Sequence, residues 1–509
     1  MFTKIEKYLK HWNQHLFLLI FLLAIVVIEL IDIRRFIADD SYFYMTIARN
    51  LALFGKQTFS GLVPTNGAHP LWLYTLTFSY WVISLINAQQ LYNPLSIVPI
   101  SLLVLIIGIL ASWKSASILG LNKLLFTIIP VGFLCAFNLI GSEANLAYAS
   151  ISILVFLSLN LKNKRTNAIL IGLAALAVVF SRLDYIFFVL IYYGWLAKKG
   201  NLRFLTLSIG VFLIPFLIYI YLNMINFGGP IPISGWLKSS FPKFSLAGFT
   251  YEKLGSQLSG YNIVFGIVPI VYSTITLYRF RKKIEGPIKI VWALLGGCVL
   301  HFIYTASFTW NATGWLWYYV LPVFLGTFVY SLNIKLLRNG VTQQLFKVLG
   351  LVIIPALFLG YSMRTATREI TWEEQAVTMT EFLLSNDIEN SIIIVGDSAG
   401  ETAFFSSNQV ISLDMLTLNR YFVEEMLASE NGLKYIITRF SEYEKPTYLL
   451  WTTGTWLGDL NFSDNLRIVS YRFKTPDKQT YQDMGSINIG EPILVSENLI
   501  VWELSIAER

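Results

Sequence analysis

The chain has 509 residues, of which 55% are hydrophobic and 14% are charged, and its mean hydropathy is +0.59. A soluble fold of this length would not be so apolar, so the composition predicts a polytopic α-helical membrane protein. The net charge of +7 lies mainly in Lys/Arg clusters between apolar segments. Because no basic tract is interleaved with aromatic residues, this charge indicates contact with the lipid bilayer and no nucleic-acid partner.

Apolar stretches separated by short polar breaks give the candidate spans, and we expect about 11–13 transmembrane helices. They lie near residues 15–33, 70–87, 94–113, 123–140, 143–161, 167–181, 184–197, 204–225, 261–277, 288–309, 315–333 and 345–362. Basic clusters at 4–10, 162–165, 198–203, 279–283 and 335–338 predict cytoplasmic loops, so the alternate loops face outward. An inside N-terminus and an outside C-terminus require an odd number of spans. One stretch between residues 70 and 113 is therefore split, re-entrant or miscounted.

This pattern predicts a transmembrane domain at 1–363, with a first extracytoplasmic loop at 34–69, and an extracytoplasmic α/β domain at 364–509. Apolar runs predict strands in the second domain at 392–395, 410–413, 435–438, 466–471 and 500–504. The string Gly396-Asp397-Ser398-Ala399-Gly400 fits the nucleophile elbow of an esterase. All four histidines precede Ser398, so none completes a triad in the hydrolase order, and we interpret the string as a strand-to-helix connection.

The first outward loop carries two adjacent carboxylates, Asp39 and Asp40. Such neighbours repel each other, which suggests chemistry at the membrane surface. From Ser41 to Phe54, the apolar residues Phe43, Ile47, Leu51 and Phe54 recur on one side, which predicts an amphipathic helix lying on the bilayer. One aspartate can cap this helix. The other is the candidate catalytic base, and we prefer Asp39.

The sequence resembles bacterial GT-C superfamily glycosyltransferases, and it is most similar to the multi-pass enzymes related to the terminal arabinofuranosyltransferases of mycobacterial cell walls. The similarity begins with Asp39-Asp40-Ser41-Tyr42-Phe43-Tyr44 and Pro64-Thr65-Asn66-Gly67-Ala68-His69-Pro70 in the first loop. It continues at Gly141-Ser142-Glu143, Ser181-Arg182-Leu183-Asp184, residues 226–238, Trp317-Tyr318-Tyr319 and residues 399–414. The resemblance therefore covers nearly the whole chain.

The resemblance implies an inverting transferase of the bacterial plasma membrane whose active site and C-terminal domain are extracytoplasmic. The donor would be a polyprenyl-phosphate-linked sugar, and the acceptor a glycan, lipid or protein of the cell envelope. Asp39 or Asp40 would take the proton of an acceptor hydroxyl. Arg182 and Lys238 would hold the departing phosphate, although cations near helix ends also extend to the interface without any such role. That alternative is weaker for Arg182, because Asp184 forms a charged pair with it.

His69, Glu143, Asp184, Trp317 and Tyr318 complete the candidate substrate-binding set. A histidine beside a proline at a helix entry is commonly interfacial, and the aromatic residues equally fit a membrane-interface belt. The sequence specifies no cofactor. Asp39, Asp40 and Glu143 offer oxygen ligands that a divalent metal could use.

The sequence holds no G-x-x-x-x-G-K-[ST] loop, which disfavours a nucleotide-driven pump. Two alternatives to the transferase remain, a secondary transporter and a lipid-linked polymer ligase. A secondary transporter would use charged groups for ion coupling, but it predicts polar residues in mid-helix and paired half-repeats. A lipid-linked polymer ligase would share the donor class and differ in the acceptor.

Overall fold

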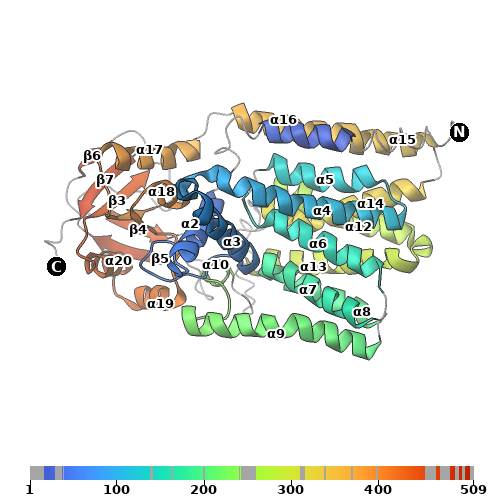
Figure 1. The fold of residues 1–509 in the computed structure, drawn as a ribbon, viewed down its shortest axis with the longest axis horizontal. Helices are drawn as coiled ribbons and strands as arrows, with labels where there is room; N and C mark the ends of the chain where they lie inside the picture. The colour runs from blue at the N-terminus through green and yellow to red at the C-terminus, as the bar shows by residue number, and fades with distance from the viewer. Residues whose placement is uncertain are drawn as a thin grey trace.

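The structure is a computed structural model of the chain, drawn in Figure 1 as a helical bundle beside a smaller unit built on a sheet. It describes residues 16–28, 37, 39–137, 141–161, 164–198, 201–239, 241, 260–309, 316–337, 340–367, 371–396, 399–452, 466–470, 482–487, 492–495 and 499–504.

Within the described residues, twelve apolar helices coincide with the twelve predicted stretches. Six are long enough to cross a membrane: Pro94–Leu119, Leu202–Phe227, Asn262–Arg279, Gly286–Phe308, Leu316–Leu336 and Gly340–Thr367. They contain α4 (Val98–Leu119), α9 (Leu202–Phe227), α12 (Val268–Arg279), α13 (Ile290–Phe308), α14 (Val320–Leu336), and α15 (Gly340–Val348) with α16 (Ile354–Thr367). The shorter ones are Leu16–Ile28, α3 (Pro70–Ile86), α5 (Lys123–Ala136), α6 (Ala144–Leu159), α7 (Arg165–Ser181) and Leu183–Ala197, which contains α8 (Ile186–Ala197). The chain is thus a multi-pass membrane protein.

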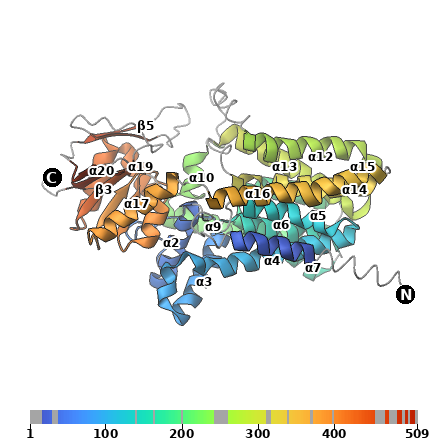
Figure 2. The same cartoon turned by 90° about the horizontal axis from the view of Figure 1, so that it is seen from above.

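Helix α3 differs from the others in direction. Figure 2 shows it running obliquely at the end of the bundle, close to α2 (Asp39–Phe54), whereas α4 lies along the bundle. The indole of Trp72 donates a hydrogen bond at 2.7 Å to the carbonyl of Gly141, which precedes α6. Leaving out α3, eleven of the twelve apolar helices remain. Hydropathy alone cannot separate an apolar helix at the end of a bundle from one inside it.

Helix α2 is confirmed, but it is buried against protein on more than the predicted side. Tyr42, Met45 and Arg49 are buried although they are not part of the predicted apolar row, and Phe54, which is, remains 67% exposed. The reason is that α2 packs between α3 and the sheet unit (Figure 2). The burial of this helix therefore extends beyond the single apolar face that the sequence predicts.

The sheet unit follows α17 (Thr371–Ser385) and is built on five strands in the order β2-β1-β3-β7-β6. The strands are β1 (Ile392–Val395), β2 (Gln409–Ser412), β3 (Thr447–Thr452), β6 (Leu494–Val495) and β7 (Leu499–Leu504). β1 pairs in parallel with β2 and β3, while β7 is antiparallel to β3 and β6. A separate antiparallel pair is formed by β4 (Leu466–Ser470) and β5 (Gln482–Ile487).

Both sides of this sheet are covered, as expected for parallel strands with continuous apolar sequence. Ile393 and Val395 face the side where α2, α17 and α18 (Ala399–Phe405) pack. Ile392 and Ile394 face the side of α19 (Arg420–Ala428) and α20 (Gly432–Ser441). The predicted fold class, a polytopic helical membrane protein with a small α/β region, is confirmed.

One predicted strand is wrong. Residues 435–438 lie inside α20, where Ile436 and Phe440 are both buried at helical spacing. The side chain of Asn431 accepts a hydrogen bond from the Lys434 amide at 2.9 Å and caps the helix. A four-residue apolar run is ambiguous between strand and helix, and here the cap and the i, i+4 pair decide.

Candidate active site

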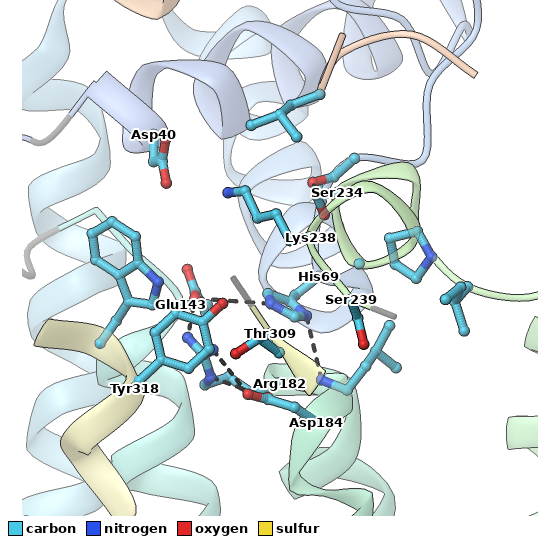
Figure 3. A pocket seen from close by; sticks show the side chains of 18 of the residues that line it. Asp40, His69, Glu143, Arg182, Asp184, Ser234, Lys238, Ser239, Thr309 and Tyr318 are labelled. Atoms are coloured by element: carbon cyan, nitrogen blue, oxygen red, sulfur yellow. Dashed lines mark hydrogen bonds and ion pairs between the residues drawn. The ribbon is translucent and has the colours of Figure 1, made fainter. Parts of the chain in front are cut away.

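A cavity of about 300 Å³ lies where the end of the bundle meets the sheet unit. Its wall is formed by α2, the α2–α3 loop, the turns before α6 and α8, α10 (Ile233–Lys238), the end of α13 and the loop after β2. The lining residues include Asp40, Tyr44, Gly67, Ala68, His69, Glu143, Arg182, Asp184, Ser234, Lys238, Ser239, Tyr304, Thr309, Trp317, Tyr318, Leu416 and Thr417. Figure 3 shows the charged side chains among them directed toward one another.

Arg182 is the centre of a buried charge network. Helix α7 ends at Ser181 and Arg182 has an extended backbone, with φ −150° and ψ 113°, so Arg182 and Asp184 leave the same turn. The guanidinium donates to Glu143 Oε1 at 2.7 Å and to the two Asp184 carboxylate oxygens at 3.2 and 3.1 Å. The side chain of Arg182 is 2% exposed. Two carboxylates therefore neutralise this one cation.

Two further side chains complete the network. His301 Nε2 lies 2.9 Å from Asp184 Oδ2. The guanidinium carbon of Arg182 sits 4.4 Å from the centre of the Tyr318 ring, a cation–π geometry that is favourable in a desolvated site. Sequence reasoning did not select His301, although a histidine in the middle of the apolar α13 was a usable signal.

His69 is a neutral imidazole in this site. Its Nδ1 accepts a hydrogen bond from the Leu183 amide at 3.3 Å, so the proton is assigned to Nε2, which lies 3.9 Å from Glu143 Oε1. Burial, reinforced by the positive charge of Arg182, lowers the pKa of His69 to about 3. The backbone amide of His69 donates to the Tyr44 hydroxyl at 3.1 Å. Burial also raises the pKa of Tyr44 well above its usual value, so this phenol keeps its proton.

The two adjacent aspartates point to different places. Asp40 lines the cavity, and Figure 3 shows the ammonium group of Lys238 extending toward it. Asp39 does not line the cavity; its Oδ1 accepts a hydrogen bond at 3.0 Å from the Glu401 amide in the first turn of α18. A Cβ at Gly400 would come within 2.5 Å of the Asp39 carbonyl, so α18 approaches α2 closely. The geometry therefore favours Asp40 over Asp39, the reverse of the sequence-based preference.

Every other predicted site residue is on the cavity wall: His69, Glu143, Arg182, Asp184, Lys238, Trp317 and Tyr318. The structure adds Leu416 and Thr417, which come from the sheet unit and carry no motif in the sequence. The nucleophile-elbow residues Asp397 and Ser398 lie outside the described residues. Around them, β1 and α18 form the expected strand and helix.

The predicted metal ligands do not converge. Within the described residues, no three His, Cys, Asp or Glu side chains are grouped so as to hold a metal ion. Asp40 and Glu143 both line the cavity, but Asp39 bonds to α18. The donor set therefore does not fit a site built from these three carboxylates.

No family model and no curated protein matches the sequence. The fold is similar to a crystal structure of ArnT from Cupriavidus metallidurans bound to undecaprenyl phosphate, with a TM-score of 0.61, 11% sequence identity and coverage of 98% of each chain. The apo structure of the same ArnT gives a TM-score of 0.60 at 11% identity, covering 98% of this chain and 99% of that one. This likeness spans the bundle and the sheet unit, so the chain shares the overall fold of these ArnT structures.

Proposed function

We propose that this protein is an integral-membrane glycosyltransferase that moves a sugar from a polyprenyl-phosphate donor to an extracytoplasmic acceptor with inversion. The observation that carries the proposal is that a carboxylate, Asp40, and a cation, Lys238, line one cavity at the end of an apolar bundle. The similar ArnT structure contains undecaprenyl phosphate, which supports the donor class.

The proposed reaction is a single displacement. Asp40 accepts the proton of the acceptor hydroxyl while the hydroxyl oxygen bonds to the anomeric carbon. The bond from that carbon to the phosphate oxygen breaks, and the phosphate departs as an anion that needs no proton. Lys238 stabilises the charge that develops on this phosphate. Attack on the side opposite the leaving group inverts the anomeric configuration.

Arg182 has a different place in this proposal from Lys238. Its three side-chain nitrogens already donate to Glu143 and Asp184, so it offers the phosphate little net positive charge. We assign it to holding the Glu143 and Asp184 carboxylates and the Tyr318 ring in position, and we assign the main phosphate contact to Lys238. Trp317, Tyr318 and His69 then form the rest of the sugar-binding wall.

The direct test uses the purified full-length chain in liposomes with a panel of radiolabelled polyprenyl-phosphate sugars. The expected result is release of polyprenyl phosphate from at least one donor and transfer of its label, and loss of both in Asp40→Asn. The product's anomeric configuration, read by NMR, should be opposite to that of the donor. Failure of every donor to be consumed would contradict the function, and retained configuration would contradict the single displacement.

We also propose that the cavity end of the bundle is extracytoplasmic. The basic residues Arg165 and Arg281 lie beside the helix ends remote from the cavity, as expected for cytoplasmic ends. Without α3, eleven apolar helices remain, which is the odd number that an inside N-terminus and an outside C-terminus require. Lys56→Cys and Gln89→Cys, at exposed positions beside the cavity end, should react with an impermeant thiol reagent applied outside. Lys164→Cys and Lys282→Cys, also exposed, should not react. The native Cys135 and Cys298 are buried, which keeps the background low. The reverse labelling pattern would overturn this orientation.

A further inference from the structure

Helix α10, which carries Lys238, is too short to set its own position. It has six residues, from Ile233 to Lys238. A helix of this length is not stable by itself in water, because its nucleation is unfavourable. Ile233 and Leu237 pack into the apolar core of the sheet unit, but apolar contacts are not directional and leave the rotation of a short helix open. Polar contacts must therefore fix where the Lys238 ammonium group points.

The side chain of Asn66 supplies these polar contacts at the start of α10. Its Oδ1 accepts a hydrogen bond from the Ile233 amide at 3.0 Å. Its Nδ2 donates to Asn223 Oδ1 at 2.9 Å and to the Ile231 carbonyl at 3.4 Å. Asn66 is 2% exposed and Asn223 is 3% exposed. One buried amide group therefore joins the C-terminal part of α9, the turn that follows it and the first residue of α10.

This pattern of contacts requires an amide side chain. A backbone N–H can only donate and a carbonyl can only accept, so the side chain at position 66 must present an acceptor and a donor next to each other. Aspartate has the shape of asparagine but no N–H, and it would turn a carboxylate oxygen toward two acceptors. Because the site is buried, water does not replace a lost contact, and each unpaired group is costly.

Asn66 is itself held in place by its two neighbours in the α2–α3 loop. The Thr65 hydroxyl donates a hydrogen bond at 3.1 Å to the Leu418 carbonyl of the sheet unit. A Cβ at Gly67 would overlap with the carbonyl of Leu416, so the loop also lies directly against the sheet unit on the other side of Asn66. Asn66 therefore acts from a fixed position.

The other end of α10 is anchored to α13. Ser239, which follows Lys238, forms an isolated β-bridge with Thr309, and its hydroxyl accepts a hydrogen bond from Tyr304 at 3.2 Å. Lys238 thus lies between two polar anchors, one at each end of the helix. The three residues of the α13 anchor line the cavity, whereas Asn66 does not. Any effect of Asn66 on the reaction must therefore pass through the segments that it holds.

Resting on the proposed glycosyltransferase function, we propose that Asn66 is a positioning residue that holds the Lys238 ammonium group where it meets the donor phosphate. A cation stabilises a developing charge best when it is already fixed in place. A displacement of about 1 Å in such a group can cost about 100-fold in rate. Without the Asn66 side chain, α10 keeps its apolar packing but loses the bonds at its first residue, so Lys238 shifts relative to Asp40 (Figure 3).

The test compares Asn66→Ala with Asn50→Ala in the full-length protein. Asn50 is a matched control, because its Nδ2 also donates to two backbone carbonyls, those of Thr58 at 2.9 Å and Phe59 at 3.1 Å, and both belong to the α2–α3 loop. Both variants should have a lower melting temperature than wild type. Only Asn66→Ala should lower kcat/KM for the donor, by about 10- to 100-fold. An equal loss of kcat/KM in Asn50→Ala would overturn the inference.

A double-mutant cycle with Lys238→Ala separates positioning from a general loss of structure. If Asn66 acts through Lys238, adding Asn66→Ala to Lys238→Ala should change kcat/KM by no more than about 2-fold, whereas independent effects would multiply. Asn223→Ala is the milder variant, because it removes one partner of Asn66 and leaves the bond to Ile233. It should lower kcat/KM less than Asn66→Ala and show the same lack of additivity with Lys238→Ala. Multiplying effects in both cycles would overturn the inference.

A second measurement does not depend on turnover. The rate at which Lys238→Cys reacts with a water-soluble thiol reagent should rise when Asn66→Ala is added, because position 238 is half-buried and a loosened α10 exposes it. Adding Asn50→Ala should leave the rate unchanged, and the native Cys135 and Cys298 are buried. Equal thiol rates with and without Asn66→Ala would overturn the positioning role. Absence of any donor turnover in wild type would instead overturn the proposed function, and the thiol rates would still decide whether Asn66 positions α10.

Discussion

Asp39→Asn and Asp40→Asn are the most informative pair of variants, because the same small change in two adjacent residues is expected to give opposite results. Asparagine keeps the shape of aspartate and can still accept a hydrogen bond through its amide oxygen, but it is not a base. Asp40 lines the cavity, whereas Asp39 Oδ1 accepts from the Glu401 amide. The two variants therefore distinguish a catalytic role from a structural one.

For Asp40→Asn we expect a large kinetic effect and a small thermodynamic one. Loss of a general base lowers rates by about 10²–10⁴-fold, which corresponds to about 3–5 kcal/mol in the activation free energy. The melting temperature should stay close to that of wild type, because no hydrogen bond between the two units depends on this carboxylate among those described.

For Asp39→Asn we expect the opposite, a small effect on the rate and a larger effect on stability. A hydrogen bond to a charged group contributes about 1.5–3 kcal/mol and a neutral one about 0.5–1.5 kcal/mol, so the change should cost about 1 kcal/mol of unfolding free energy. Asp39→Ala should cost more, about 1–3 kcal/mol, because it leaves a donor of the largely buried Glu401 without this partner. Sugar transfer by Asp39→Asn should remain within a few-fold of wild type.

The assay measures donor turnover in liposomes and thermal unfolding in detergent for each variant. A catalytically dead Asp39→Asn protein with an unchanged melting temperature would refute the assignment and restore Asp39 as the base. Wild-type turnover by Asp40→Asn would refute it equally. Loss of activity in both variants together with a lower melting temperature in Asp40→Asn would show that the two carboxylates support structure alone.

Other variants probe the remaining features. Arg49→Met should lower the unfolding free energy by about 1.5–3 kcal/mol, because Arg49 donates a hydrogen bond at 2.9 Å to the Phe404 carbonyl. The exposed Arg165→Met is the control, and an Arg49→Met protein as stable as that control would contradict the prediction. Arg182→Met should destabilise by about 3–5 kcal/mol, because it leaves two buried carboxylates without their cation; a lower kcat/KM at full stability would instead favour direct phosphate binding. Lys238→Ala should lower kcat/KM for the donor about 10- to 1,000-fold, and unchanged donor kinetics would remove Lys238 from the site. Because the folded pKa of His69 lies near 3, below the usual value of about 6.5, its stabilising contribution is complete above pH 6.5 and is lost as pH falls toward 3. His69→Gln should flatten that part of the stability–pH curve and leave the pH–rate profile above pH 6.5 unchanged.

Much of the fold could be predicted because it depends on local patterns. Apolar stretches of span length mark helices wherever they pack, so each predicted stretch coincides with one. The direction in which a helix runs does not follow from its own sequence. The sequence of α3 is as apolar as a membrane span, and only its packing beside α2 distinguishes it from the other helices. The run at 435–438 was misassigned because four residues are too few to show a period.

In the candidate site, too, some residues could be predicted from local sequence and others only from the fold. Eight of the nine predicted residues line the cavity. The charged residues among them could be selected because charged side chains at helix mouths are rare without a role. The choice between Asp39 and Asp40 could not be made from neighbours in the chain, because α18, which bonds Asp39, follows 360 residues later.

The position of β7 has a consequence for how the protein matures. This strand lies inside the sheet, between β3 and β6, and it is formed by residues 499–504. The sheet that carries Leu416 and Thr417 to the cavity therefore cannot close until these residues have been made and delivered to the side of the membrane where the sheet folds. Every apolar helix of the bundle precedes them in the chain, so membrane insertion can be finished while the cavity wall is still incomplete. The order of synthesis thus leaves the proposed active site without Leu416 and Thr417 until the last strand of this sheet is in place.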